Sequence, residues 1–490
     1  MSRYLHAPWV AIAALLCGCL PEQSPETWEK SVVSIRATRY KYDYSQPWVR
    51  ETSNTDKVGV VIDGETILTT AEHLGDHTLV TVRREGRGKW WPAQVKWIDY
   101  HANLALLGSA EALFWEGLLP ARLAKVVPDA GEVTVRRWRD GRLEDAKGEI
   151  TDVRSRRSQL SHAHALALEV KADVEGSGWG EVVTRGGEVI GMAASAYEKS
   201  LNVITATFAE QVIAAVRAGE YRGLGLFTFE WQPGRNPDTL AQLRTPDAER
   251  GVIVTRVPGY PEPEKVLQPR DVILEIDGFR VNPEGDYRDP KFGFLSIEFL
   301  ADRGRWAGDA LPMKIVRDGR VADVEYRLPA ASFSVDLVPL ETFDRPPEYL
   351  IVGGLVFQPL TEPLMRSMGR SAPVRFACYR DDLPTAERPS IVFLSQVLPD
   401  PINVDYHQLR FQPLERLNGR PIRVLRDIID AVRNPTGDVL IFEFTEGLGL
   451  NRIVLDASNL PEVDARILKR YGIPSALQLN ADAPDQKSGP

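Results

Sequence analysis

Cysteine is scarce in this chain, which has three among 490 residues. Cys17 and Cys19 stand together near the N-terminus, so Cys378 has no partner if those two are removed or modified. An intramolecular disulfide is then not expected, and stability must come from packing. The chain has seven histidines and no free cysteine pair near them, so the sequence gives no ligand set typical of a metal site. It also has no glycine-rich phosphate-binding loop before a helix, so nucleotide binding is not expected. We therefore expect no metal and no cofactor.

Basic residues are not in excess either. Lys and Arg number 59 against 68 Asp and Glu, which gives a formal net charge of −9 and argues against a nucleic-acid-binding surface. The basic cluster Arg154–Arg157 is accordingly predicted to be a solvated turn. A chain of this length should form about three domains. Its 35 prolines and 11 tryptophans favour a β-rich, loop-rich protein.

The N-terminus contains no apolar run of membrane-spanning length, because the stretch from Pro8 to Leu16 is too short for a lasting anchor. It ends in Leu16-Cys17-Gly18-Cys19, which resembles a bacterial lipobox. That resemblance implies a signal peptide over 1–18, a lipidated Cys19 and a tether over 19–29. The residue after Cys19 is Leu20 rather than Asp, which resembles the pattern for sorting to the outer membrane. We therefore expect a lipid-anchored envelope protein that faces the periplasm. An ordinary secretory signal or a chance cysteine pair is the alternative.

Short β-rich runs separated by turn residues fill the region 30–220. Two consecutive groups of such runs suggest two small barrels or one sandwich. Apolar residues at helical spacing then predict a helix over Ala209–Ala218. The predicted strands are Val32–Ile35, Val58–Ile62, Thr66–Thr69, Leu79–Val82, Trp90–Trp97, Leu104–Leu107, Val133–Trp138, Leu166–Val170 and Val189–Met192.

Two further units follow the first region. The segments Gly223–Leu226, Gly251–Val254 and Leu267–Gly278 resemble a PDZ domain, assigned to 221–331. A Gly-Leu-Gly loop of this kind offers backbone N–H groups to the terminal carboxylate of a peptide. The strand-and-turn pattern from Tyr349–Phe357 onward resembles a second, modified PDZ-like domain over 332–478. The last residues, 479–490, are predicted to be a loose tail.

The segment Gly176–Val183 resembles the nucleophile loop of trypsin-like serine proteases of the Deg/HtrA type, which reads Gly-Asn-Ser-Gly-Gly-Pro before an apolar strand. Gly176 falls on the first glycine, Ser177 on the asparagine and Gly178 on the nucleophile. Together with the PDZ-like segments, the chain resembles plant-type Deg/HtrA proteases. This resemblance implies a mostly β fold: a chymotrypsin-like double β-barrel, a PDZ domain and a second PDZ-like α+β domain.

The same resemblance places the other two members of the catalytic triad. In Leu68–Leu74, Glu72 takes the position of the histidine and His73 stands one residue late. Asn103 takes the position of the aspartate, directly before the apolar strand Leu104–Leu107. Acyl transfer in this fold needs the serine, the histidine and the orienting carboxylate together, and an Asn for that Asp lowers turnover about 10⁴-fold in trypsin. The resemblance therefore implies a degenerate triad of Glu72, Asn103 and Gly178.

These observations predict a noncatalytic envelope protein that binds peptides or unfolded protein ends, scaffolding or regulating protein quality control. The alternative is an active serine endopeptidase that uses the displaced His73 and Ser177. A third hypothesis is a purely structural subunit that assembles with active family members. The family resemblance also implies a homo- or hetero-oligomer that is trimer-based. The residues predicted to bind peptide by β-augmentation are Gly223, Leu224, Gly225 and Leu226.

Overall fold

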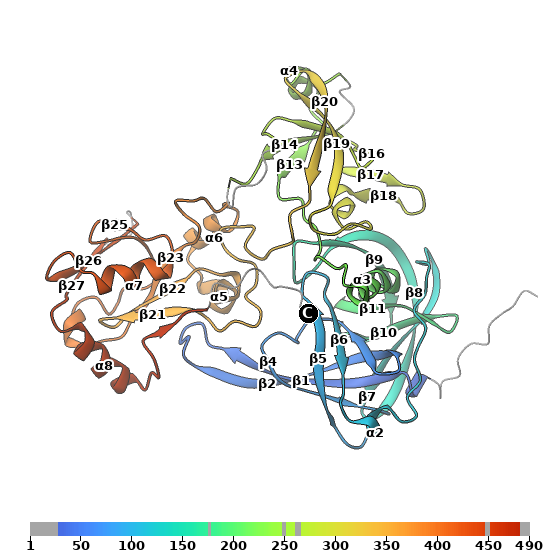
Figure 1. The fold of residues 1–490 in the computed structure, drawn as a ribbon, viewed down its shortest axis with the longest axis horizontal. Coiled ribbons are helices and arrows are strands. Elements are labelled where there is room, and N and C mark those ends of the chain that lie inside the picture. Colours follow the sequence, from blue (N-terminus) through green and yellow to red (C-terminus); the bar gives the residue numbers. More distant parts are fainter. Residues whose placement is uncertain (1–27, 175–177, 247–250, 260–265, 446–450, 481–490) are drawn as a thin grey trace, which may run out of the picture.

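The computed structural model of the chain describes residues 28–174, 178–246, 251–259, 266–445 and 451–480. Within these residues the predicted mostly β architecture is confirmed: two closed six-stranded barrels precede three separate sheets of six, two and eight strands (Figure 1). Cys19 of the proposed lipid anchor and Ser177 of the nucleophile loop lie outside the described residues. Nothing in the structure therefore bears on either of them.

The first barrel has the strand order β1-β2-β3-β6-β5-β4. Alternate residues of β1, namely Val33, Ile35 and Ala37, pack into its interior because successive side chains of a strand point to opposite faces. The short helix α2 (Ala112–Trp115) follows the last strand. The strands are β1 (Val32–Tyr42), β2 (Arg50–Asp63), β3 (Thr66–Thr69), β4 (His77–Arg83), β5 (Trp91–Asp99) and β6 (Leu104–Gly108).

The second barrel has the order β10-β11-β12-β9-β8-β7. One prediction was wrong: Arg154–Arg157 is no turn but the end of the long strand β8, paired with β9. Arg154 and Arg156 there form ion pairs with Glu169. The strands are β7 (Gly131–Arg139), β8 (Arg142–Arg157), β9 (His164–Ala172), β10 (Val182–Arg185), β11 (Glu188–Tyr197) and β12 (Ser200–Thr205).

Helix α3 (Ala206–Ala218) closes the barrel region and contains the predicted helix. Thr205 caps its N-terminus by accepting from the N–H of Phe208, and Gly219 ends it in the left-handed conformation that glycine adopts without a Cβ penalty. Its buried face packs into a core shared by both barrels, with Val58 and Leu104 of the first and Val182 and Met192 of the second. The helix thus packs into the core that joins the two barrels.

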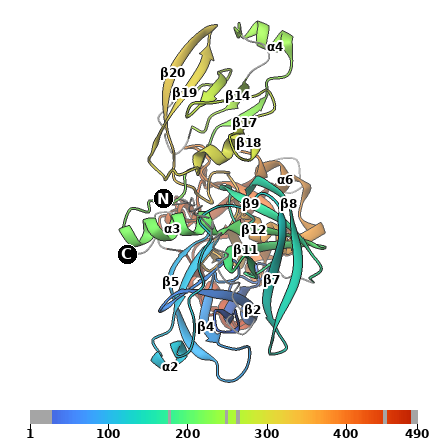
Figure 2. The same cartoon turned by 90° about the vertical axis from the view of Figure 1, so that its right-hand side faces the viewer.

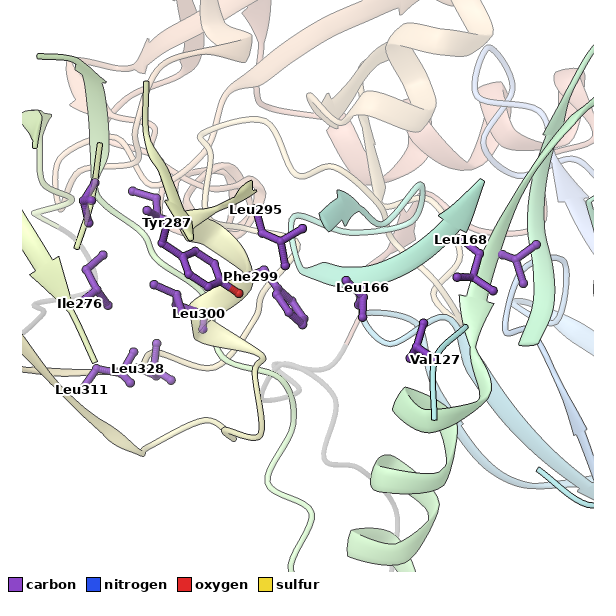
Figure 3. Packing of buried hydrophobic residues seen from close by; sticks show 14 of the residues in the cluster. Val127, Leu166, Leu168, Ile276, Tyr287, Leu295, Phe299, Leu300, Leu311 and Leu328 are labelled. Atoms are coloured by element: carbon purple, nitrogen blue, oxygen red, sulfur yellow. The ribbon is translucent and has the colours of Figure 1, made fainter. Parts of the chain in front are cut away.

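A six-stranded sheet of order β13-β14-β15-β19-β20, with β16 on β15, forms the third unit. Figure 2 shows β14, β19 and β20 standing above the barrels. Phe299 and Leu295 of this unit share one buried cluster with Leu166 of β9, as Figure 3 shows. The elements are β13 (Glu230–Pro233), α4 (Pro237–Gln242), β14 (Val252–Arg256), β15 (Val272–Ile276), β16 (Phe279–Arg280), the hairpin β17 (Asp286–Asp289) and β18 (Gly293–Ser296), η1 (Ile297–Ala301), β19 (Ala310–Arg317) and β20 (Arg320–Arg327).

An eight-stranded sheet of order β27-β26-β24-β23-β22-β21-β28, with β25 on β24, forms the last unit, at the left of Figure 1. Helix α7 packs its apolar face onto this sheet through Leu425 and Ile428. The elements are β21 (Tyr349–Val352), β22 (Leu355–Pro359), α5 (Glu362–Met368), η2 (Gly369–Ser371), α6 (Val374–Arg380), β23 (Val392–Val397), η3 (Pro401–Asn403), β24 (Gln412–Leu417), β25 (Arg420–Pro421), α7 (Leu425–Arg433), β26 (Val439–Phe444), β27 (Arg452–Asp456), α8 (Leu460–Tyr471) and β28 (Leu477–Gln478).

Candidate functional site

Residues at the three predicted triad positions lie on loops that meet where the two barrels join. Glu72 follows β3, and its backbone N–H donates to Oδ1 of Asn103, which directly precedes β6, at 3.0 Å. The loop before β10 reaches the first barrel where Val58 of β2 donates its N–H to the carbonyl of Trp179 at 3.3 Å. The structure thus brings Glu72 and Asn103 into contact and places the remainder of the predicted nucleophile loop beside them.

Gly178 is held in a conformation that excludes a side chain. Its φ is +71°, in the left-handed region that disfavours residues with a Cβ. A Cβ built there would lie 2.4 Å from the carbonyl carbon of Ser195 and 2.5 Å from the nitrogen of Ala196. Both are backbone atoms of β11, so they cannot rotate away. A nucleophilic hydroxyl at position 178 is incompatible with this backbone.

Trp179 packs against His73, the histidine that stands one residue late. The two ring centroids are 4.5 Å apart in an edge-on arrangement. Nε2 of His73 lies 3.8 Å from Oε1 of Glu72, beyond hydrogen-bonding distance. Burial lowers the pKa of His73 to about 4, helped by the nearby charges of Arg39 and Lys57. The imidazole is therefore neutral near pH 7.

A buried lysine beneath these loops was missed by the sequence reasoning. Lys57 of β2 is 3% exposed, and its Nζ donates to Oγ1 of Thr70 at 2.8 Å and to the carbonyl of Glu72 at 2.6 Å. Burial lowers the pKa of Lys57, and the carboxylates of Glu72 and Glu181 oppose that shift. Burial likewise raises the pKa of Glu72 against the effect of Lys57. The only sequence signal was a charge directly before the apolar run Val58–Ile62.

Glu72, Asn103 and Gly178 stand at the three predicted triad positions. They present a carboxyl, a carboxamide and no side chain, and the internal Lys57 donates to the backbone carbonyl of Glu72. The neutral ring of His73 has the Trp179 ring packed against it. Across the described ranges, no group of three or more His, Cys, Asp or Glu side chains is placed to hold a metal ion.

The predicted peptide loop pairs with the chain that follows β20. The N–H of Leu226 donates to the carbonyl of Pro329 at 3.0 Å, the N–H of Ala331 donates to the carbonyl of Leu224 at 2.8 Å, and Gly225 forms a bridge with Ala330. The side chains of Leu224 and Leu226 are buried. Gly223 and Leu224 also line a cavity of about 640 Å³, which we call the junction pocket.

Residues 333–344, which we call the strap, link β20 to the last unit and pack onto the first barrel. Phe343 stacks on Tyr100 at a centroid distance of 4.1 Å, and Phe333 stacks on His101 at the same distance. Asp344 accepts from the Tyr100 hydroxyl and from the N–H of Asp76, both at 2.7 Å. The strap therefore contacts the two loops that carry Glu72 and Asn103.

The strap contact should depend on pH through Asp76. Burial, reinforced by the neighbouring charge of Asp344, raises the pKa of Asp76 to about 7. A carboxyl whose pKa is raised on folding stabilises the fold while it is protonated, so this contribution is lost as pH rises through about 7. We expect the thermal midpoint to fall between about pH 5 and pH 8, and Asp76→Asn to flatten that fall.

Asp140→Asn is the matched control, because Asp140 also has a positive φ but is exposed in the β7–β8 turn. Differential scanning calorimetry of the three proteins at both pH values measures the effect. If the thermal midpoint of Asp76→Asn falls with pH as steeply as that of the wild-type protein, Asp76 is not the group responsible.

Two six-stranded barrels that meet at these loops define the chymotrypsin-like double-barrel class. A family model described as a PDZ domain matches residues 338–478. Protease Do-like 2, chloroplastic, of Arabidopsis thaliana is 30% identical over 466 residues, which cover 91% of this chain and 74% of that protein. The chain belongs to the protease Do-like (Deg/HtrA) family.

Two more similar proteins were found. Protease Do-like 4, mitochondrial, of Arabidopsis thaliana is 24% identical over 462 residues, which cover 91% of this chain and 84% of that protein. A solved structure of the HtrA-type protease AlgW with a decapeptide aligns with a TM-score of 0.45 and 15% identity, over 61% of this chain and 95% of that chain. The predicted family, the double barrel and a PDZ domain in the last unit are confirmed. The PDZ domain predicted over 221–331, the domain bounds and the site residues stay predictions.

Proposed function

We propose that this protein is a noncatalytic member of its family that binds peptides or unfolded protein ends. The observation that carries the proposal is the backbone at Gly178, where the family resemblance places the nucleophile. Its positive φ and the 2.4 Å approach to Ser195 leave no space for a hydroxyl-bearing side chain. Asn103 and Glu72 add a carboxamide and a carboxyl in place of the orienting carboxylate and the base.

Peptide binding is assigned to the loop of Gly223, Leu224, Gly225 and Leu226. Two of these residues line the junction pocket, whose volume of about 640 Å³ is in the range of ligand sites. Neither Gly223 nor Leu224 donates its N–H in the hydrogen bonds found among the described residues. Backbone amides in such a loop are suited to hold the terminal carboxylate of a bound chain.

The proposal extends to location and assembly. The lipobox-like segment ending at Cys19 supports a lipid anchor, with the protein at the outer membrane facing the periplasm. No helix among the described residues is long and apolar enough to cross a membrane. A role in envelope protein quality control and a homo- or hetero-oligomer, trimer-based as the family resemblance implies, are part of the same proposal.

Unfolded casein tests the proposal. We expect the mature protein to retain casein in a pull-down assay but to produce no fragments, and Ser177→Ala to behave identically. Ser177→Ala is the informative variant because Ser177 and His73 are the pair that an active enzyme would use. Cleavage of casein that is lost in Ser177→Ala would overturn the noncatalytic assignment and establish the alternative, a serine endopeptidase.

A further inference from the structure

The junction pocket is formed where four parts of the chain meet. Its lining includes His101 from the first barrel, Gly223 and Leu224 from the peptide loop, the strap, and Leu425 of α7 in the last unit. A peptide end held at the loop amides would therefore contact the first barrel, the strap and the last unit as well as the loop. The side chains in these other walls determine which peptides fit.

The ionisable lining of the junction pocket is predominantly acidic. Four carboxylates and two guanidinium groups line it. Most of these charges already have partners within the chain: Asp99 accepts from the Tyr221 hydroxyl at 2.7 Å, and Glu341 pairs with Arg366. The lining carboxylates are Asp99, Asp336, Glu341 and Glu348, and the guanidinium groups belong to Arg222 and Arg345.

Asp336, in the strap, is a lining carboxylate that forms no ion pair with a lysine or arginine side chain among the described residues. The one side chain paired with it among the described residues is His162, with Nε2 at 3.5 Å from Oδ2. Burial lowers the pKa of His162 to about 4, so this partner is neutral near pH 7. The Asp336 side chain is 30% exposed and can therefore reach a ligand in the pocket.

The charged groups around Asp336 do not fully compensate the negative charge of its carboxylate. Burial raises the pKa of Asp336 to about 6, and the two nearby cations that lower it are opposed by two nearby anions. A cation brought in by a ligand would stabilise the charged form of this carboxyl. The groups facing it are Arg157 of β8, Arg256 of β14, Glu230 of β13, Asp381 after α6 and His162 before β9.

We propose that the junction pocket selects peptide ends that carry a lysine or arginine side chain, whose cation pairs with Asp336. The inference rests on the proposed function, because the same peptide would place its terminal carboxylate at the loop of Gly223 and Leu224. The basic side chain is then chosen by the strap, and the chain end by the loop. Selectivity for charge and affinity for a free carboxylate thus have separate origins.

Fluorescence anisotropy with synthetic peptides tests the inference. The probes are fluorescein-labelled heptapeptides of alanine and leucine, with one lysine at the third, fourth or fifth position from a free C-terminus. Matched probes replace lysine with glutamine or glutamate, or amidate the C-terminus. At about pH 7.5 the wild-type protein should bind the best lysine peptide about fivefold more tightly than its glutamine partner, the gain of a partly exposed ion pair.

Asp336→Asn should bring that ratio close to one. Asp323→Asn, on the exposed face of β20 and outside the pocket lining, should leave it unchanged. The preference should also fall as pH drops through about 6, because the carboxyl of Asp336 becomes protonated. Circular dichroism confirms that both variants are folded.

The outcomes separate the two proposals. Equal binding of lysine and glutamine peptides by the wild-type protein overturns the selectivity, as does a preference for glutamate or a preference that survives Asp336→Asn. Equal binding of acid and amide peptides overturns the carboxylate role of the loop while leaving the Asp336 result interpretable. Failure of every peptide to bind contradicts both.

Discussion

Gly178→Ala should lower the free energy of unfolding by about 2–4 kcal/mol. About 1–2 kcal/mol comes from holding a Cβ-bearing residue in the left-handed region, and a similar or larger amount comes from overpacking. The added methyl group would meet the backbone of Ser195 and Ala196, which β11 holds in register with β10 and β12. Urea denaturation of the mature protein measures the loss.

Gly186→Ala is the control for that measurement. Gly186 lies in the turn after β10 with a φ of +56°, but a Cβ there would meet nothing within 4 Å. It should therefore show the conformational cost alone, about 1–2 kcal/mol. Equal losses in the two variants would show that position 178 has room for a side chain, which removes the main support for the noncatalytic proposal.

Lys57→Met should lower the free energy of unfolding by about 3–5 kcal/mol near pH 6, where the lysine is still charged because burial lowers its pKa only to about 7. Removing the ammonium of a buried charge cluster leaves its carboxylates without compensation, and this costs more than the intact cluster contributed. Glu72 is the carboxyl most affected, because Lys57 lowers its pKa and burial raises it. Without Lys57 the pKa of Glu72 rises further. The variant should therefore lose stability as the pH rises through the pKa of Glu72 and this buried carboxyl becomes charged.

The loss should accordingly be smaller near pH 4 than near pH 6, because a larger share of Glu72 is protonated at the lower pH. Lys57→Met combined with Glu72→Gln should recover part of the stability, since a neutral amide replaces the uncompensated carboxylate. Lys96→Met is the matched control, because Lys96 is exposed and, among the described residues, donates to the carbonyl of Glu65 alone. A loss that is the same at both pH values would contradict the charge cluster.

The sequence predicted the barrels well because their strands have short apolar runs and clear turn residues. Thr66–Thr69 is β3 with the predicted bounds, and the helix predicted over Ala209–Ala218 lies within α3. The long strand β8 was missed because its burial is low and its residues are mostly charged. A polar strand on the outside of a barrel gives little hydrophobic signal to read.

The site was predicted less completely, because its contacts join residues that are distant in the sequence. The pattern identified Glu72 and Asn103 separately, but not the hydrogen bond between them. Lys57 reads as an ordinary charge at the start of a strand until the fold buries it beneath Thr70. The contact between Asp76 and Asp344 spans 268 residues, a distance over which a single sequence gives no sign of pairing.

Labelling with a fluorophosphonate probe tests the central claim most directly, because the probe reacts only with an activated serine. Mature protein would be incubated with the probe and its intact mass determined, with Ser177→Ala as the control. The account predicts no adduct on either protein, since position 178 has no hydroxyl and the ring of Trp179 packs against His73. A stoichiometric adduct on the wild-type protein that is absent from Ser177→Ala would contradict it.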